Sequence, residues 1–387
     1  MEFAIADMMA VILPTAQQTA ALRATLFRDE AGRSAWAAWQ HRHGGPESLV
    51  RAERPGRLLP MLAEAASRNQ IELQSDVRRI LRTAQLWEQL RGERVGAICQ
   101  NALEELKKRK IDFVVLKGIA LANTDYPDAA LRHCHDCDLL VRPDQRERAA
   151  RALLASRFSL GYSEQGSGST VTVHESGLPI SLHERLFRIP HYAAPVDEMW
   201  ARAHTREVYG VKAQVFSPED MLLHVCGHAA CSTSREHLTW VCDSWMILAQ
   251  NTTLNWRLFS EMARRCNLEL PLAVLTRYLA EEMGAPIPDT VLMHLQQEST
   301  TADAADREAA LFGATTGSRG DLRGMVKSAK GWADRMILAK WLLFPAPRFI
   351  RWKYRIQSRW LTPVYYFWRP IRGGLRLVRE SFSRSQP

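Results

Sequence analysis

The sequence predicts an α+β fold, in which a small mixed sheet lies between an N-terminal and a C-terminal helical domain. Residues 15–110 carry apolar side chains at three- and four-residue spacing, which predicts helices. Residues 111–141 contain two short strand-like runs joined by a helical segment, and residues 169–187 alternate as a hairpin. The helical spacing returns at Ser217. Helices followed by clustered strands and further helices are typical of α+β proteins.

A chain of 387 residues is long enough for two or three domains and a tail. The helix expected from residue 217 has a well-marked start, with Ser217 as N-cap, Pro218 at the first helical position and Asp220 three residues after the cap. We expect four segments, namely an N-terminal helical region at 1–100, a core at 101–205, a C-terminal helical domain at 206–320 and a basic aromatic tail at 321–387.

The net charge of +9 is concentrated in the tail. Residues 321–387 hold 15 Lys and Arg against 3 Asp and Glu, so the remainder of the chain is slightly acidic. Seven cysteines without a recognisable signal peptide indicate a reducing compartment, and we expect a cytoplasmic protein. The sequence contains no run of about 18 uncharged apolar residues, so we expect no transmembrane helix.

The tail places five tryptophans among basic residues. This composition suits the headgroup zone of an anionic bilayer, so we expect peripheral contact of residues 321–387 with the inner face of the membrane. It would also suit a nucleic-acid backbone, or a solvated tail packed partly on the helical domain. The acidic body offers no extended basic groove, which argues against a long nucleic acid. The tryptophans are Trp332, Trp341, Trp352, Trp360 and Trp368.

The stretch "HCHDCDLLV" places Asp136 and Asp138 two positions apart on a predicted strand. Side chains at that spacing point to the same face, where two carboxylates repel each other unless a cation lies between them. Mg²⁺ is bound through one or two carboxylates and substrate phosphates, and a bare Asp-x-Asp is also common on polar edge strands.

The residues before this pair favour phosphate chemistry. In "VVLKG" a strand ends at Gly118, where a helix begins, and the exposed N–H groups of a helix start suit a phosphate. Lys117 adds a cation, and Arg132 adds a guanidinium that can grip phosphate oxygens at two points. We therefore expect Lys117, Gly118 and Arg132 to bind a nucleotide and Asp136 and Asp138 to bind Mg²⁺.

Two groups of histidines and cysteines invite a zinc interpretation. Cys134 and Cys137 form a C-x-x-C, but no second ligand pair follows at the usual spacing, and alternation along a strand separates their side chains. His224, His228 and Cys231 share one helix face, where packing is the commoner role. This face, or Asp243, could also line the cleft beneath a nucleotide.

The ordered strings "VVLKGIAL", "DYPDAALRHCHDCDLLVRPDQ", "ISLHERL" and "SPEDMLLHVCGHAA" resemble a bacterial family of uncharacterised nucleotidyltransferase-like proteins. That family belongs to the polymerase-β-type nucleotidyltransferase superfamily and is often found with polysaccharide biosynthesis genes. The resemblance covers roughly residues 80–250. It implies a nucleotidyltransferase core in which Asp136 and Asp138 hold the metal and Lys117, Gly118 and Arg132 hold the triphosphate.

The chain departs from the resembled family at one position. The superfamily supplies a third carboxylate from a later strand, and the resemblance places this group at Ser181, in "ISLHERL". A serine is neither an anionic metal ligand nor a strong general base. Glu184 or Glu175 could substitute as the catalytic carboxylate, the substrate could supply the missing group, or the fold could be retained without catalysis. Strict alternation puts Glu184 on the opposite face unless a bulge intervenes.

Three functional hypotheses follow from these residues. The first is a Mg²⁺-dependent nucleotidyltransferase that moves a nucleoside monophosphate from a nucleoside triphosphate to an unidentified hydroxyl or phosphate, linked to polysaccharide biosynthesis. The second is a catalytically silent nucleotide-binding adaptor at the membrane surface, which the Ser181 departure motivates. The third is nucleotide transfer to an RNA end or a partner protein.

Overall fold

A computed structural model provides the fold and side-chain contacts of most of the chain. It describes residues 12–51, 57–161, 169–187, 189, 191–231, 238–303, 306–307, 309–310, 332, 336, 350, 356, 358–366 and 368. Most of the tail at 321–387 lies outside these residues, as do Trp341 and Trp352, so the expected membrane contact stays a prediction.

A seven-stranded mixed sheet forms the centre of the molecule, in the order β3-β4-β5-β2-β1-β7-β6. The neighbouring pairs β2·β5 and β1·β7 are parallel, and the other pairs are antiparallel. The central strands β1 and β2 are buried along their whole length, and for β1 the continuous apolar run predicts this burial. The strands are β1 (Phe113–Val115), β2 (Cys137–Val141), β3 (Phe158–Leu160), β4 (Ser169–His174), β5 (Pro179–His183), β6 (His204–Val208) and β7 (Val211–Val215).

The strands expected from the apolar run at 111–116, from "HCHDCDLLV" and from the 169–187 hairpin are confirmed. The hairpin β6–β7 was missed, because residues 206–215 were assigned to the C-terminal helical domain. Its turn, Tyr209–Gly210, has positive φ at both residues, as a two-residue hairpin turn requires. The alternation on each side of "YG" is the sequence signal that could have identified it.

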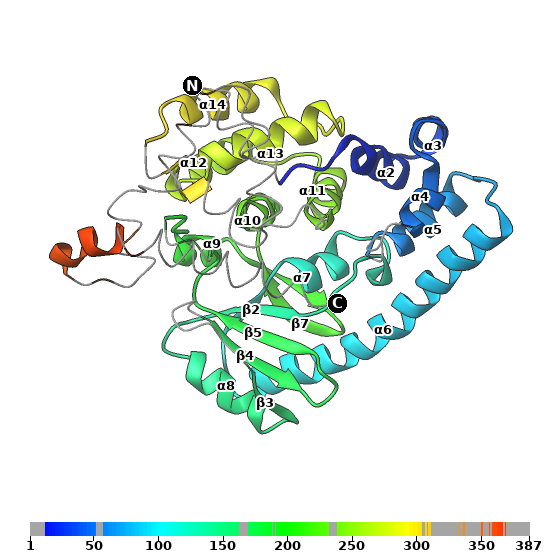
Figure 1. The fold of residues 1–387 in the computed structure, drawn as a ribbon. Helices are drawn as coiled ribbons and strands as arrows, with labels where there is room; N and C mark the ends of the chain where they lie inside the picture. The colour runs from blue at the N-terminus through cyan, green and yellow to red at the C-terminus, as the bar shows by residue number, and fades with distance from the viewer. Residues whose placement is uncertain are drawn as a thin grey trace.

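Helices cover both faces of the sheet (Figure 1). The long helix α6 and helix α8 lie on one face, and α7 and α10 lie on the other. Helix α10 begins as expected, since the Ser217 side chain accepts a hydrogen bond from the Asp220 N–H at 3.3 Å. These four helices are α6 (Ser75–Lys108), α7 (Lys117–Thr124), α8 (Arg146–Leu154) and α10 (Pro218–Ala230).

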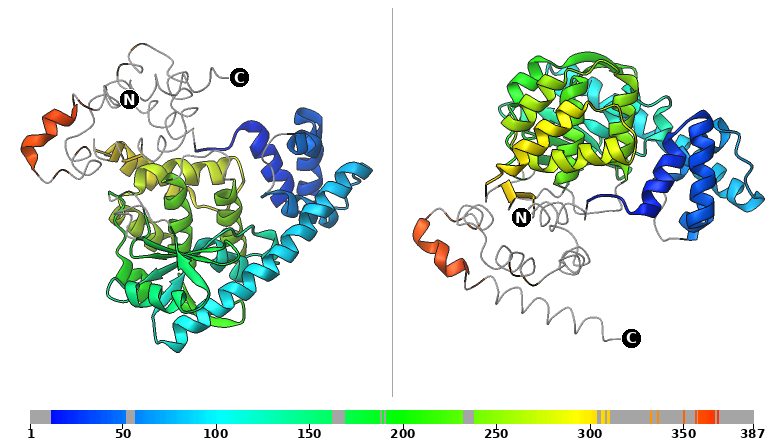
Figure 2. Two further views of the ribbon diagram at one scale, coloured as in Figure 1. Left: turned by 60° about the horizontal axis from the view of Figure 1, so that its bottom comes forward. Right: turned by 90° about the horizontal axis from the view of Figure 1, so that it is seen from above.

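The N-terminal helices form a group beside the C-terminal helices (Figure 2). Thr19 and Tyr278 join the two groups through a 2.8 Å hydrogen bond between their hydroxyls, and Arg23 forms an ion pair with Glu282 at 3.0 Å. The N-terminal helices are α2 (Ala16–Leu26), α3 (Asp29–His43), α4 (Gly45–Arg51) and α5 (Leu59–Arg68).

The C-terminal helices pack on α10 and on one another above the sheet (Figure 1). Within the described part of the chain, no helix combines the length and the apolar character that crossing a bilayer requires. These helices are α11 (Thr239–Gln250), α12 (Trp256–Arg265), α13 (Glu269–Glu281) and α14 (Asp289–Thr300), and the short helices are α9 (Val196–Ala201), η1 (Ala129–Leu131) and η2 (Arg359–Leu361).

The expected domain boundaries can be compared with these elements. Helix α6 runs across the expected boundary at residue 100, and the sheet continues past residue 205 to Val215. The expected mixed-sheet core with helical segments on both sides in sequence is confirmed, while the division into four domains stays a prediction.

Candidate active site

Asp138 is a buried carboxylate at the second position of β2, with both oxygens engaged. The Lys117 ammonium lies 2.8 Å from Oδ2, and Nε2 of His183 lies 2.9 Å from Oδ1. Burial alone would raise the pKa of Asp138, but the Lys117 charge and the His183 hydrogen bond outweigh it and hold this pKa well below its usual value. The carboxylate is therefore ionised and already carries a cation.

Asp136 directly precedes β2, and about a third of its side chain is exposed. Its carboxylate lies 3.4 Å from Nε2 of His135. The charge of Arg57, from the N-terminal helical region, also acts on Asp136. Arg57 is not among the predicted site residues, because no local pattern connects residue 57 with the paired aspartates.

The paired aspartates have the donor chemistry of a magnesium site. Among the residues that the structure describes, no three His, Cys, Asp or Glu side chains converge on one point, so protein ligands alone do not complete a site. Mg²⁺ commonly takes one or two carboxylates and completes its shell with water and substrate phosphates. The ammonium on Asp138 shows that a cation fits beside this carboxylate, so the donor set fits Mg²⁺ bound together with a nucleotide.

Lys117 and Gly118 begin helix α7 directly after β1. Lys117 has a φ of 23°, a sparsely populated conformation for a residue with a side chain, and such strain is frequent at functional sites. A Cβ at Gly118 would lie 3.5 Å from Nη2 of Arg132 and 3.6 Å from Sγ of Cys134, which are ordinary contact distances. The protein's own packing thus leaves room for a side chain at Gly118, and its predicted role in phosphate binding remains a prediction.

Strand β5 supplies the neighbours of Asp138. In the parallel pairing of β2 with β5, Asp138 is the direct partner of Ser181. Side chains at paired positions of adjacent strands point to the same face, and His183 follows on that face two residues later. The register therefore places Ser181 beside Asp138, and His183 is the residue whose side chain contacts Asp138.

The two glutamates considered as substitutes for Ser181 are paired elsewhere. Glu184 forms an ion pair at 3.0 Å with Arg146 at the start of α8, on the opposite face of the sheet. Glu175 lies between β4 and β5 and pairs with Arg157 at 3.1 Å. The structure therefore does not bring Glu184 to Asp138, as strict alternation along the strand requires.

Arg132 is held by a buried carboxylate of helix α11. Its Nε and Nη2 donate to Oδ1 and Oδ2 of Asp243 at 2.7 and 2.8 Å, and the Tyr126 hydroxyl donates to Oδ1 at 2.7 Å. Burial lowers the pKa of Arg132, but Asp243 outweighs it and raises this pKa well above its usual value. Two nitrogens of the guanidinium are thus committed to Asp243, and the third, Nη1, donates to the backbone carbonyl of His133. The predicted phosphate contact of Arg132 stays a prediction.

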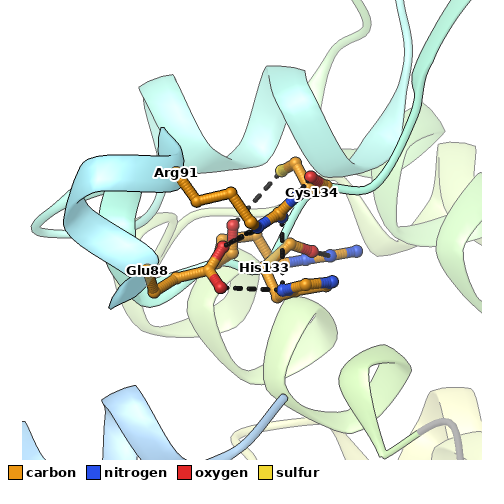
Figure 3. Close-up of polar contacts among 5 residues, drawn as sticks. Glu88, Arg91, His133 and Cys134 are labelled. Atoms are coloured by element: carbon orange, nitrogen blue, oxygen red, sulfur yellow. Dashed lines mark hydrogen bonds and ion pairs between the residues drawn. The ribbon is translucent and has the colours of Figure 1, made fainter. Parts of the chain in front are cut away.

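Helix α6 fixes the segment that leads into β2 (Figure 3). Glu88 accepts hydrogen bonds from Arg91 and lies 2.8 Å from Nδ1 of His133. Arg91 also donates to the backbone carbonyl of Cys134. These contacts tie residues 133–134, just ahead of the paired aspartates, to a rigid helix, and α6 thereby positions the entry to the site.

Helix α10 brings two histidines close to Asp138 and Lys117. His224 is fully buried between Phe187 and Phe216, and its Nδ1 has no hydrogen-bond partner among the described residues. Burial, and secondarily the Lys117 charge, lowers the pKa of His224 to about 3. His228, one turn later in α10, is exposed.

The cysteines have different partners rather than a shared metal. All seven are free and buried. The Cys134 thiol donates to the carbonyl of Arg132 at 3.2 Å, whereas the thiol of Cys137 interacts with Cys99. Cys231 is buried at the end of α10, while His228 of the same helix is exposed.

The mixed sheet with helices before and after it in sequence is the fold that the resemblance to nucleotidyltransferases implies. Residues 43–284 match the family described as uncharacterised nucleotidyltransferase. This match covers more than half of the chain, and the chain belongs to that family.

Similar solved structures carry related descriptions. One is the lincosamide antibiotic adenylyltransferase LnuA bound to lincomycin, at 13% identity and a TM-score of 0.30, over 39% of this chain and 94% of that one. Another is an antigenic nucleotidyltransferase-like protein from Paracoccidioides brasiliensis, at 19% identity and a TM-score of 0.36, over 51% and 96%. At such scores they establish no shared substrate. No curated protein is significantly similar in sequence.

Proposed function

We propose that the protein transfers a nucleoside monophosphate from a nucleoside triphosphate to a hydroxyl or phosphate acceptor, with Mg²⁺ and with release of pyrophosphate. In this reaction an acceptor oxygen attacks the α-phosphorus, and the bond from that phosphorus to the pyrophosphate oxygen breaks. The bound cation neutralises charge on the triphosphate. The resemblance to proteins found with polysaccharide biosynthesis genes supports an acceptor from that chemistry.

The observation that carries this proposal is the ion pair between Asp138 and Lys117. A buried carboxylate needs a compensating cation, and here the cation sits on a long flexible side chain at the start of a helix. When a nucleotide and its cation arrive, Lys117 can turn from Asp138 to a phosphate oxygen without leaving the carboxylate uncompensated. Asp136 and Asp138 would hold the cation, which would neutralise phosphate charge, and Lys117 and the α7 N–H groups would hold the phosphates.

Calorimetry with each of the four nucleoside triphosphates, with and without Mg²⁺, tests the proposal. We expect Mg²⁺-dependent binding that is lost when Asp136 and Asp138 are both replaced by Asn. Pyrophosphate release is measured in the same samples with candidate acceptors such as sugar phosphates. Equal binding by wild type and the double variant would overturn the proposed site.

Ser181 and the pairing of Glu184 favour a second candidate, a silent nucleotide-binding adaptor at the membrane surface. The proton of a hydroxyl acceptor must pass to a base, which a serine cannot provide. Three tryptophans of the tail are exposed, as insertion at a bilayer interface requires. They are Trp332, Trp360 and Trp368.

Vesicle sedimentation separates this candidate from the enzyme. The adaptor predicts nucleotide binding without pyrophosphate release, together with binding to anionic vesicles that is lost when residues 321–387 are removed. Turnover with any acceptor would dismiss the silent adaptor. Equal sedimentation with neutral and anionic vesicles would argue against a role for the basic residues of the tail.

A further inference from the structure

Strand β5 carries one side chain that already touches the candidate metal ligand. Ser181 lies beside Asp138 in the strand pairing, but no hydrogen bond joins the two side chains among the described contacts. His183, two residues later on the same face, reaches Asp138 with its Nε2. About a quarter of the His183 side chain is exposed, so solvent reaches the ring.

We propose that His183 replaces the missing third carboxylate and binds the divalent cation together with Asp138. This inference rests on the proposed function, because it concerns the same cation. It assigns a metal-binding role to a residue for which neither the paired-aspartate pattern nor the family description provides one.

The distance between the two donor atoms fits joint ligation. Two ligands at right angles in an octahedral shell, each about 2.1 Å from the cation, lie about 3.0 Å apart. Nε2 of His183 and Oδ1 of Asp138 are 2.9 Å apart. A cation could therefore replace the hydrogen that they now share with little movement of either side chain.

The electrostatic arrangement leaves His183 free for this role. Lys117 already balances the Asp138 charge through the other carboxylate oxygen, so His183 is not needed as a positive partner. Asp136 lies two residues before Asp138, directly ahead of β2, and a turn of its side chain from His135 could supply a third protein ligand.

A nitrogen ligand predicts a different metal preference from that of an all-carboxylate site. Imidazole suits transition metals, whereas Mg²⁺ favours oxygen ligands, and Mn²⁺ accepts both. We therefore expect the protein to bind Mn²⁺ at least tenfold more tightly than Mg²⁺ in the presence of a nucleotide.

Pulsed electron paramagnetic resonance of Mn²⁺ bound to the full chain tests this assignment directly. The probe is Mn²⁺ with a non-hydrolysable nucleoside triphosphate analogue. We expect ¹⁴N modulation of the Mn²⁺ echo, which shifts to ¹⁵N frequencies when only the histidines are labelled with ¹⁵N. This labelling distinguishes a protein imidazole from a nitrogen of the nucleotide base.

His183→Gln should remove the histidine signal and weaken Mn²⁺ binding about tenfold or more. His183→Asn serves as a second variant if the first does not fold. His204→Gln, at the first position of edge strand β6, is the matched control and should keep the signal. In the complementary variant, Ser181→Asp, the preference should shift from Mn²⁺ toward Mg²⁺ by about tenfold.

Three results would overturn the assignment. Bound Mn²⁺ without a histidine signal would exclude His183 as a ligand and leave the aspartate site of the proposed function intact. A signal that survives both His183 variants and disappears in His228→Gln would assign the ligand to α10. Absence of Mn²⁺ binding by the wild-type protein would also refute the assignment of His183 as a metal ligand. Nucleotide binding, measured separately, would then decide whether the proposed function stands.

Discussion

Two buried aspartates, Asp138 in β2 and Asp243 in α11, are neutralised in different ways. Asp243 holds the guanidinium of Arg132 at two points and also accepts the Tyr126 hydroxyl. Asp138 has a single lysine ammonium on one oxygen and a histidine on the other. The Asp243 arrangement is planar and held by three hydrogen bonds, and it ties the sheet region to the C-terminal helices.

This difference distinguishes a structural ion pair from a site prepared for a ligand. A bidentate arginine cannot leave its carboxylate without leaving two buried charges uncompensated. A lysine can swing to another anion, and a histidine can exchange a hydrogen bond for a metal bond. Asp138 is therefore the carboxylate whose partners can exchange, as the proposed reaction requires.

The largest expected effect is on activity. Asp138→Asn removes the charge that binds the cation, and we expect pyrophosphate release to fall about a hundredfold to a thousandfold. Circular dichroism should show an unchanged fold, because Lys117 can turn toward solvent. Asp144→Asn, at an exposed aspartate after β2, is the control with full activity. An equally active Asp138→Asn protein would break the comparison.

The next effect is on stability. Asp243→Asn leaves the buried Arg132 charge uncompensated, and we expect the free energy of unfolding to fall by about 3 kcal/mol in urea denaturation. Tyr126→Phe, which removes one hydrogen bond to the same carboxylate, should lower it by about 1 kcal/mol. A smaller loss for Asp243→Asn than for Asp138→Asn would reverse the proposed roles.

The third effect concerns pH and the buried His224. Its pKa is about 3 in the folded protein and about 6.5 in the unfolded chain, so its contribution is complete above pH 6.5 and is lost as pH falls toward 3. Between pH 6.5 and pH 3 only the unfolded chain binds a proton at this histidine. The free energy of unfolding should therefore decrease by about 1.4 kcal/mol for each unit by which the pH falls. His224→Phe, which fits the neighbouring Phe187 and Phe216, should flatten this slope, whereas exposed His294→Gln should leave it unchanged.

The smallest effect is expected at Glu184. Its pairing with Arg146 on the α8 face predicts that Glu184→Gln changes pyrophosphate release by less than about twofold and stability by less than about 1 kcal/mol. Steady-state kinetics and urea denaturation measure the two quantities. A hundredfold loss of activity would return Glu184 to the role of catalytic base and contradict the strand alternation described above.

Local patterns were sufficient for the parts of the fold that short-range forces determine. The apolar run of β1 and the cap at Ser217 both agree with the sequence prediction, because each depends on a few adjacent residues. The β6–β7 hairpin was assigned to a helical segment, although its "YG" turn is local. The alternating signal there is diluted by charged residues on the exposed edge strand β6.

The site could be predicted only as far as adjacent residues reveal it. Asp136, Asp138, Lys117 and Gly118 follow from their order in the sequence, although their roles remain predictions. The partner of Arg132 is more than a hundred residues away in α11, and no local pattern predicts that pairing. The contact of His183 with Asp138 likewise depends on strand register, which forms only when β2 and β5 pair.

Helix α6 has a consequence for cooperativity. Its 34 residues span about 51 Å, so one continuous rod packs against α5 at one end and against α8 and β7 at the other. Unravelling either end removes the support of the other, and the N-terminal helices and the sheet are expected to unfold in a single transition. Amide hydrogens at the two ends of α6 should then exchange with solvent at similar rates, through the same global opening.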